Sequence, residues 1–276
     1  MKKILKRLKF IYDVKRISDT DIAGHVPLIY KLASKIKPRV IIQNGVRNGN
    51  SGISLAIAQL ENNNLLVDID LVDLMDGDMR EIRNTVPDNW INFIGNVQST
   101  DILAELQEYK GKVDLFFSDT SHNYEDTIFE LEHYMPLLSP TGIMLMHDMD
   151  PWNRYKGQAK ALDEYFSKRP EWNWCVQTGN NGIGIFYRDE EHLHGIKCNN
   201  DIGIWPYGQD FKKIIDSTNK LKKEGILENL TYGPNVHASD DMEGYINKFV
   251  KRGPANWYIK DEDLTREDRL KRESIV

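Results

Sequence analysis

Short apolar runs alternate with amphipathic segments along most of the chain. From about residue 20 to residue 188, each short run is followed by a stretch whose apolar side chains recur at helical spacing. The short runs predict buried strands, and the helical spacing predicts helices that pack by one face. This alternation predicts an α/β fold, with a Rossmann-like, mainly parallel sheet and helices on both of its faces.

The boundaries of these elements follow from turn residues and helix caps. The predicted strands are Val40–Ile42, Leu66–Leu71, Trp90–Gly95, Val113–Phe117, Gly142–Met146, Trp172–Gln177 and Ile183–Arg188. The predicted helices are Asp19–Lys35 with its cap at Ser18 or Asp19, Gly52–Gln59, Met79–Asn84, Ile102–Tyr109 and Gly157–Lys168. A further amphipathic helix joins the fourth and fifth strands. The turn Gly179-Asn180-Asn181-Gly182 predicts that the last two strands form an antiparallel hairpin, which closes a seven-stranded sheet.

Three regions are predicted along the chain. Residues 1–18 form a basic amphipathic helix, residues 19–188 form the α/β domain, and residues 189–276 elaborate it as a substrate cap or an oligomer interface. In this last region the helical pattern is weaker and predicts two helices, Phe211–Glu224 and Glu262–Glu273.

The N-terminal helix carries its apolar and basic residues on opposite faces. Its apolar residues are Ile4, Leu5, Leu8, Ile11 and Tyr12. One interpretation is a helix that lies on an anionic membrane surface, which would make the protein membrane-peripheral. The other is a helix that packs its apolar stripe on the domain or on a second subunit. We favour the second, because amphipathic helices usually pack in this way.

The composition limits which binding partners and which cellular compartment we expect for this protein. The chain has 276 residues, of which 40% are hydrophobic, and a net charge of −6. It therefore lacks the basic field typical of nucleic-acid-binding proteins. Two cysteines, Cys175 and Cys198, are too few for a disulfide scaffold, so we expect a reducing, cytoplasmic environment. No apolar run approaches the roughly 18 residues that span a bilayer.

Polar side chains follow the fourth and fifth predicted strands directly. Asp119 and His122 come after one strand, and His147 and Asp148 come after the next. A helical crossover makes these two strands parallel, so their carboxyl ends meet at one edge of the sheet. Open α/β sheets bind their ligands at that edge. Two adjacent carboxylates repel each other unless a positive group lies between them, so Asp119 and Asp148 predict a metal site.

A glycine loop follows the first strand, with Gly45 and Gly49 spaced as G-x-x-x-G. Asp73 follows the second strand, where a carboxylate can bind a ribose hydroxyl pair. A glycine loop and then a strand-end carboxylate is the layout of an adenosine-type cofactor site. The loop lacks the G-x-G-x-x-G spacing typical of dehydrogenases, and no lysine follows it as in a P-loop. Gln98 and Ser99, after the third strand, are candidates for contact with the adenine.

These motifs resemble a known family. Gln43-Asn44-Gly45-Val46-Arg47-Asn48-Gly49-Asn50-Ser51 resembles the first motif of class I S-adenosylmethionine-dependent methyltransferases. The segment from Asp119 to Glu125, followed by the segment from Pro140 to Asp148, resembles the metal-dependent sugar O-methyltransferases and the cephalosporin hydroxylase-like group. The resemblance covers about residues 38 to 188.

The resemblance implies a set of roles for these residues. S-adenosylmethionine would contact Gln43, Gly45, Gly49, Ser51 and Asp73, and His122 would be the general base. Asp119, His147 and Asp148 would hold a divalent metal. Oxygen ligands favour Mg²⁺, which is the metal we expect, and a histidine ligand leaves Mn²⁺ as the alternative. The first strand in this family usually ends in an acidic residue, and here that position is Gln43.

Two functions remain open. The first is an O-methyltransferase that acts on a sugar hydroxyl of a glycan or a glycosylated metabolite, as a monomer or a homo-oligomer. The second is a non-catalytic binding or scaffold protein of the same fold, for which Gln43 and the long C-terminal region are the motivation. An alternative role for each strand-end residue is a helix cap or a hydrogen-bonded loop residue.

Overall fold

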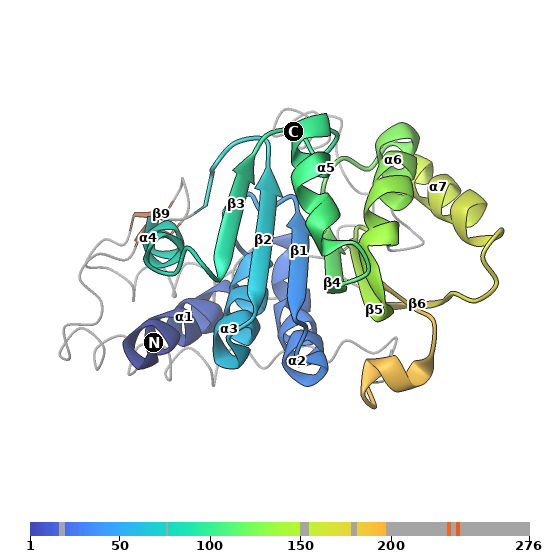
Figure 1. The fold of residues 1–276 in the computed structure, drawn as a ribbon. Coiled ribbons are helices and arrows are strands. Elements are labelled where there is room, and N and C mark those ends of the chain that lie inside the picture. The colour runs from blue at the N-terminus through green and yellow to red at the C-terminus, as the bar shows by residue number, and fades with distance from the viewer. Residues whose placement is uncertain are drawn as a thin grey trace, which may run out of the picture.

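The computed structural model describes residues 1–16, 20–75, 77–149, 155–177 and 181–196, together with two short strands farther along the chain. A seven-stranded sheet lies at its centre (Figure 1). Its strands are β1 (Val40–Asn44), β2 (Leu65–Asp70), β3 (Trp90–Ile94), β4 (Val113–Ser118), β5 (Leu138–His147), β6 (Asn173–Gln177) and β7 (Ile183–Tyr187). The strand order is β3-β2-β1-β4-β5-β7-β6, and β7 is antiparallel to both of its neighbours. The predicted mainly parallel sheet with a terminal antiparallel hairpin is confirmed.

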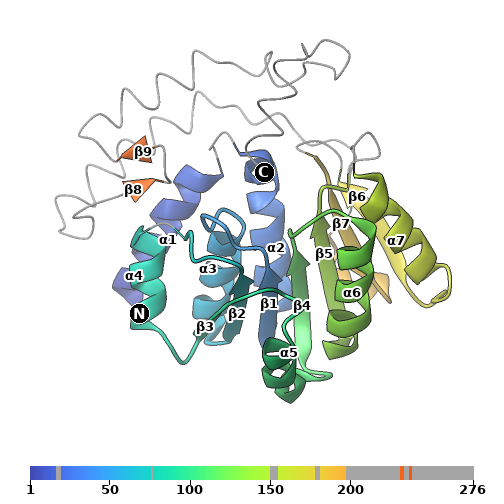
Figure 2. The same ribbon diagram turned by 90° about the horizontal axis from the view of Figure 1, so that it is seen from above.

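Helices cover both faces of the sheet (Figure 2). One apolar core lies between the sheet and α1 (Lys2–Lys15), α2 (Val26–Ile36), α3 (Gly52–Asn62) and α4 (Gly77–Thr85). The other core lies between the sheet and α5 (Thr100–Leu106), α6 (Tyr124–Tyr134) and α7 (Lys156–Phe166). Short 3₁₀ helices are η1 (Asp21–His25), η2 (Gln107–Tyr109), η3 (Met135–Leu137) and η4 (Glu190–Leu193). Alternate residues of each strand enter opposite cores, as a sheet covered on both faces requires.

The strand order places the binding edge between β1 and β4. The chain adds β2 and β3 on one side of β1 and then returns to add β4 on the other side. The loops that leave β1 and β4 therefore diverge at their carboxyl ends, which is where sheets of this kind bind their ligands.

The N-terminal helix packs its apolar stripe on the domain, as one of the two interpretations predicts. Leu8, Ile11 and Val14 are buried, and α1 lies against α3. On its polar side, Arg7 pairs with Asp78 and Glu81 of α4. The protein itself thus covers the stripe, and contact of the basic face with a membrane stays a prediction.

Several predicted boundaries are wrong in the structure. The helix predicted from Asp19 is instead η1 followed by α2, and its predicted caps lie outside the described residues. Pro27 explains the break, because a residue without an N–H fits the first turn of α2 but cannot continue a helix from before it. β1 extends to Asn44, so Gln43 lies within the strand. β2 ends at Asp70 rather than at Leu71, and β5 begins earlier, at Leu138.

Cys175 also differs from expectation. Cys175 of β6 is disulfide-bonded, whereas the sequence favoured reduced cysteines. The only other cysteine in the sequence, Cys198, lies outside the described residues. The spacing of cysteines in a sequence does not by itself show whether they come close enough to form a disulfide. No helix in the described part of the chain is long and apolar enough to cross a bilayer.

Little of the C-terminal region is described. Its two short strands are β8 (Thr231–Tyr232) and β9 (Val236–His237), and β8 lies against α4. The helices predicted at Phe211–Glu224 and Glu262–Glu273 fall outside the described residues.

Candidate active site

The glycine loop and the end of β4 pack directly on each other. The backbone N–H of Asp119 donates to the carbonyl of Asn44 at 3.0 Å, and that of Gly45 donates to the carbonyl of Ile69 at 3.0 Å. Gly45 has a φ of +78°, and a Cβ at this position would lie 2.0 Å from the Asp119 carbonyl oxygen. Only glycine combines this dihedral with so close an approach. The predicted cofactor loop and the predicted metal ligand Asp119 are therefore in direct backbone contact.

Gln43 and Ser51 lie beneath the loop. Gln43 is fully buried, and its Nε2 donates to Ser51 Oγ at 2.7 Å. Its Oε1 is buried without a hydrogen-bond partner. Gly49 has a φ of +81° and lies close to Met79 of α4. These residues thus form the base and the turn of the loop, and their contact with a cofactor stays a prediction.

Asp70, rather than Asp73, is the carboxylate at the end of β2. Its Oδ2 accepts the backbone N–H of Arg47, in the glycine loop, at 2.5 Å. Burial raises the pKa of Asp70, and hydrogen bonds from backbone N–H groups oppose that rise. Sequence analysis missed Asp70 because the predicted strand ran one residue too far. β2 is buried on both faces, so the sequence pattern gives no signal for its last residue.

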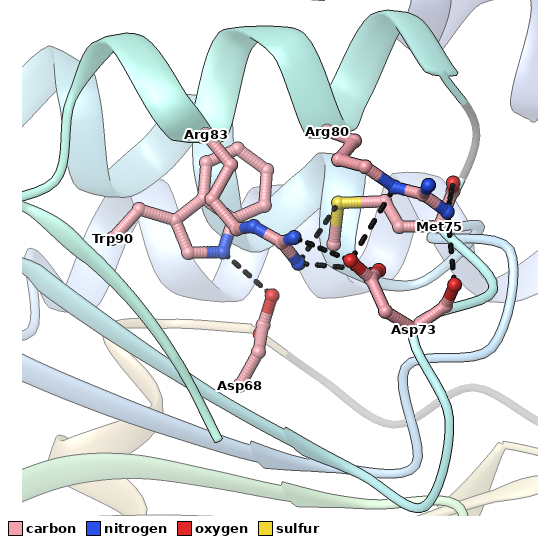
Figure 3. Close-up of polar contacts among 6 residues, drawn as sticks. All are labelled: Asp68, Asp73, Met75, Arg80, Arg83 and Trp90. Atoms are coloured by element: carbon pink, nitrogen blue, oxygen red, sulfur yellow. Dashed lines mark hydrogen bonds and ion pairs between the residues drawn. The ribbon is translucent and has the colours of Figure 1, made fainter. Parts of the chain in front are cut away.

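Asp73 lies three residues farther on and is held by two arginines of α4 (Figure 3). Its Oδ2 lies 2.8 Å from Arg83 Nη2 and 3.3 Å from Arg80 Nε. Burial opposes the charge of Asp73, but the two guanidinium groups outweigh it and hold its pKa below the usual value. The same figure shows Asp68 of β2, which accepts the indole N–H of Trp90 at 2.6 Å. Asp73 therefore fixes the β2–α4 connection through ion pairs.

Asp68 makes the stability of the domain depend on pH. It is fully buried, and its Oδ1 has no hydrogen-bond partner. Burial raises its pKa to about 7, although Trp90 and Arg83 oppose the rise. The folded state therefore holds this proton more tightly than the unfolded state does. The stabilisation is present at low pH and is lost as pH rises from about 4 through about 7.

Asp68→Asn is expected to reduce this pH dependence, because asparagine keeps an oxygen for Trp90 and does not ionise. We expect the wild-type melting temperature to fall by about 5 °C more than that of the variant between pH 5.5 and pH 8. Differential scanning calorimetry measures this difference. Exposed Asp88→Asn is the control and should follow wild type. Parallel curves for Asp68→Asn and wild type would contradict the assignment.

The predicted adenine contacts lie at the neighbouring strand end. Gln98 Nε2 donates to Asp126 Oδ1 of α6 at 2.5 Å, and Ser99 precedes α5 without making a side-chain cap. Both residues lie between the end of β3 and the start of α5. A role in adenine binding stays a prediction.

The four polar residues predicted to gather after β4 and β5 do so. His122 Nε2 lies 3.0 Å from Asp148 Oδ2. His147 Nδ1 lies 3.4 Å from Asp119 Oδ1 and 3.3 Å from Asp148 Oδ2. His147 and Asp148 are buried, with 1% and 6% of their surface exposed, whereas Asp119 and His122 are partly exposed. The cluster thus has a buried floor and an open side.

The cluster is strongly charged and locally strained. Burial disfavours a charge on His147, but Asp119 and Asp148 outweigh it and hold its pKa well above the usual value. Asp148 has a φ of +61°, a left-handed conformation that aspartate adopts uncommonly. Strain of this kind concentrates at functional sites.

The donor atoms fit a divalent metal. The ligand atoms of Asp119, His122 and Asp148 lie within 4.8 Å of one another, and those of Asp21, His147 and Asp148 form a second such group. Three carboxylates and two imidazoles provide the mixed oxygen and nitrogen set that suits Mn²⁺ or Fe²⁺ better than Mg²⁺. In this structure His147 lies between the two carboxylates, with Nδ1 within 3.4 Å of Asp119 Oδ1 and within 3.3 Å of Asp148 Oδ2.

Three residues that support the cluster escaped the sequence analysis. Asp21 comes from η1. Gln158 of α7 donates its side-chain N–H to the His147 carbonyl at 2.8 Å and its backbone N–H to the His122 carbonyl at 3.2 Å. Glu130 of α6 accepts the hydroxyls of Ser118 and Thr120, on either side of Asp119. Burial raises the pKa of Glu130 to about 7 against these hydrogen bonds. Each is an ordinary residue of an amphipathic segment, which gives no sequence signal.

The strand order and the loop after β1 form a Rossmann-like fold of the kind that class I methyltransferases have. Residues 42–149 match a family described as "Methyltransferase domain". The matched segment runs from β1 through the cluster at Asp148 and covers about two fifths of the chain.

Individual relatives are distant. A putative O-methyltransferase from Klebsiella pneumoniae superposes with a TM-score of 0.50 at 16% identity, covering 67% of this chain and 90% of that one. The O-methyltransferase TomG from Streptomyces achromogenes, solved with SAM, superposes with a TM-score of 0.48 at 20% identity, covering 60% and 80%. The uncharacterized protein y4gI from Sinorhizobium fredii is 25% identical over 183 residues, covering 62% of this chain. The chain spans about a fifth of the length of y4gI.

Proposed function

We propose that this protein is an S-adenosylmethionine-dependent O-methyltransferase that uses a divalent metal and methylates a sugar hydroxyl. The observation that carries the proposal is the contact between the two predicted sites. Gly45 of the glycine loop lies against the backbone of Asp119, whose side chain reaches the histidine and carboxylate cluster. A methyl donor on the loop and an acceptor at the cluster would therefore be neighbours, as direct transfer requires.

His122 is the proposed general base. Its ring is partly exposed at the open side of the cluster and packs on Tyr155, with ring centroids 4.1 Å apart. As the acceptor oxygen attacks the methyl carbon, the carbon–sulfur bond breaks and sulfur recovers the electron pair. The acceptor proton moves to the His122 imidazole, which acts as the general base. The products are a methyl ether, S-adenosylhomocysteine and protonated His122.

Asp119, His147 and Asp148 are the proposed metal ligands. A bound divalent cation supplies charge that lowers the pKa of a hydroxyl near it. Gln158 and Glu130 hold these ligands in place through their hydrogen bonds to the two strand ends. His147 must lose its proton to bind a metal, so metal affinity should rise with pH.

The proposal for a sugar acceptor rests on the resemblance of the Asp119–Glu125 and Pro140–Asp148 segments to sugar O-methyltransferases. Two carboxylates and a metal suit a vicinal diol, because both of its oxygens can approach one cation. Tyr155 beside His122 offers an aromatic face of the kind that packs on sugar rings.

Isothermal titration calorimetry with S-adenosylmethionine tests the cofactor assignment. We expect a dissociation constant in the range of about 1 μM to 1 mM. Asp70→Asn is expected to weaken binding by about 10-fold, because Asp70 ends β2 and meets the glycine loop. Asp73→Asn is the matched comparison, and its effect should be smaller, since Arg80 and Arg83 already pair with that carboxylate.

Two outcomes would change these conclusions. If Asp73→Asn weakened S-adenosylmethionine binding more than Asp70→Asn did, Asp73 would be the residue that contacts the ribose, as the sequence predicted. No heat of binding at millimolar cofactor would favour the second function, a non-catalytic protein of the same fold, for which Gln43 in place of an acidic residue is the motivation.

A further inference from the structure

The 3₁₀ helix η1 lies across the edge that holds both predicted sites. At its start, Thr20 Oγ1 accepts the side-chain N–H of Asn50, in the glycine loop, at 2.9 Å. At its end, the ring of His25 meets the ring of His147 edge-on, with centroids 5.5 Å apart. The segment thus contacts the glycine loop at one end and the histidine and carboxylate cluster at the other.

Asp21 is the charged residue that this segment brings to the cluster. Its ligand atom lies within 4.8 Å of those of His147 and Asp148. Two hydrogen bonds orient the carboxylate: Oδ1 accepts the N–H of Ile22 at 2.9 Å, and Oδ2 accepts Asn181 Nδ2 at 3.0 Å. A carboxylate has about four lone-pair sites, so both oxygens can still bind a cation.

The negative charge of the cluster indicates a role for Asp21 in binding a cation. It adds a third carboxylate to Asp119 and Asp148, and like charges this close repel each other unless a cation lies among them. His147 offers a ring nitrogen to the same group of ligand atoms as Asp21. The buried pair His147 and Asp148 belongs to the group of Asp21, while Asp148 also belongs to the group of Asp119 and His122.

We propose that Asp21 is a further ligand of the divalent cation, supplied by the N-terminal segment. This inference rests on the proposed metal-dependent function. Binding the cation through Asp21 fixes η1 over the site, and η1 is bonded to the glycine loop through Thr20 and Asn50. Metal binding and cofactor binding therefore favour each other, and the coupling is reciprocal.

Mn²⁺ binding, followed by electron paramagnetic resonance of the free ion, tests the proposal without any activity measurement. Asp21→Asn is expected to weaken Mn²⁺ binding by at least about 10-fold. S-adenosylmethionine should tighten Mn²⁺ binding in wild type and much less in this variant. Exposed Asp88→Asn is the matched control and should bind Mn²⁺ as wild type does. A melting curve checks that each variant is folded.

A second variant keeps the test decisive if Asp21→Asn does not fold. Asn181→Gly removes the donor that orients Asp21 and suits the φ of +66° at that position. It should weaken Mn²⁺ binding less than Asp21→Asn would. The role of Asp21 would be overturned if Asp21→Asn bound Mn²⁺ with wild-type affinity while Asp148→Asn lost most of its Mn²⁺ affinity. If only Asn181→Gly folds, wild-type Mn²⁺ affinity in that variant counts in the same way. Either result would leave the proposed function intact. No Mn²⁺ binding by wild type would overturn the metal-dependent function itself.

Discussion

Asp148→Asn is expected to lower kcat/KM by about 1,000-fold, the size of effect seen when a group that stabilises charge in the transition state is removed. Asp148 belongs to both candidate metal groups and also lies 3.0 Å from His122. Asparagine is the appropriate substitution because it tolerates the left-handed φ of +61°, whereas alanine would add backbone strain. The measurement is methyl transfer from labelled cofactor to a panel of glycosides, at saturating and limiting Mn²⁺.

Cofactor binding separates this effect from misfolding. Asp148 is not among the residues of the glycine loop, so calorimetry should give the variant a dissociation constant for S-adenosylmethionine within about 3-fold of wild type at zero metal. Extensive chelation of wild type should reproduce the loss of activity, and added Mn²⁺ should restore it. Undiminished turnover after chelation would exclude a metal from the reaction.

His122→Ala is expected to lower kcat by about 100-fold or more, as the loss of a general base does. KM for the acceptor should change little, because the base acts on the proton rather than on binding. The pH dependence of kcat should also change, with the rate of the variant still rising at high pH, where the acceptor loses its proton without help. Stopped time courses between pH 6 and pH 10 provide this measurement.

His133→Ala is the matched control for that variant. His133 is an exposed histidine of α6 that stacks on Phe129, away from the cluster, and its loss should leave kcat unchanged. If His122→Ala kept the wild-type rate at neutral pH, another group would have to accept the proton. His147 would then be the first candidate to examine.

The sequence predicted the sheet and its binding edge because both depend on local patterns. Apolar runs followed by amphipathic helices predict parallel strands, and parallel strands bring their carboxyl ends together. Asp119 and Asp148 could therefore be placed side by side from their positions after two consecutive strands. The structure confirms this neighbourhood, with His147 within 3.4 Å of both carboxylates.

Residues that reach the site from elsewhere could not be predicted in this way. Asp21 is far from the cluster in the sequence and lies in a 3₁₀ helix, which has no strong pattern. The predicted end of β2 was one residue too late, so Asp73 was predicted to be the strand-end carboxylate in place of Asp70. The ends of predicted elements are their least reliable part. Asp73 also gained two arginine partners from α4, and only the packing of that helix reveals them.

The absence of a side chain at Gly45 has a consequence for how this protein can diverge. Because no Cβ fits between the loop and Asp119, a substitution there would displace the proposed cofactor loop and the proposed metal ligand together. Descendants can change the partly exposed residues of the cluster, such as Asp119 and His122, one at a time. Position 45 is different: a lineage that loses glycine there must reshape the glycine loop and the end of β4 at once.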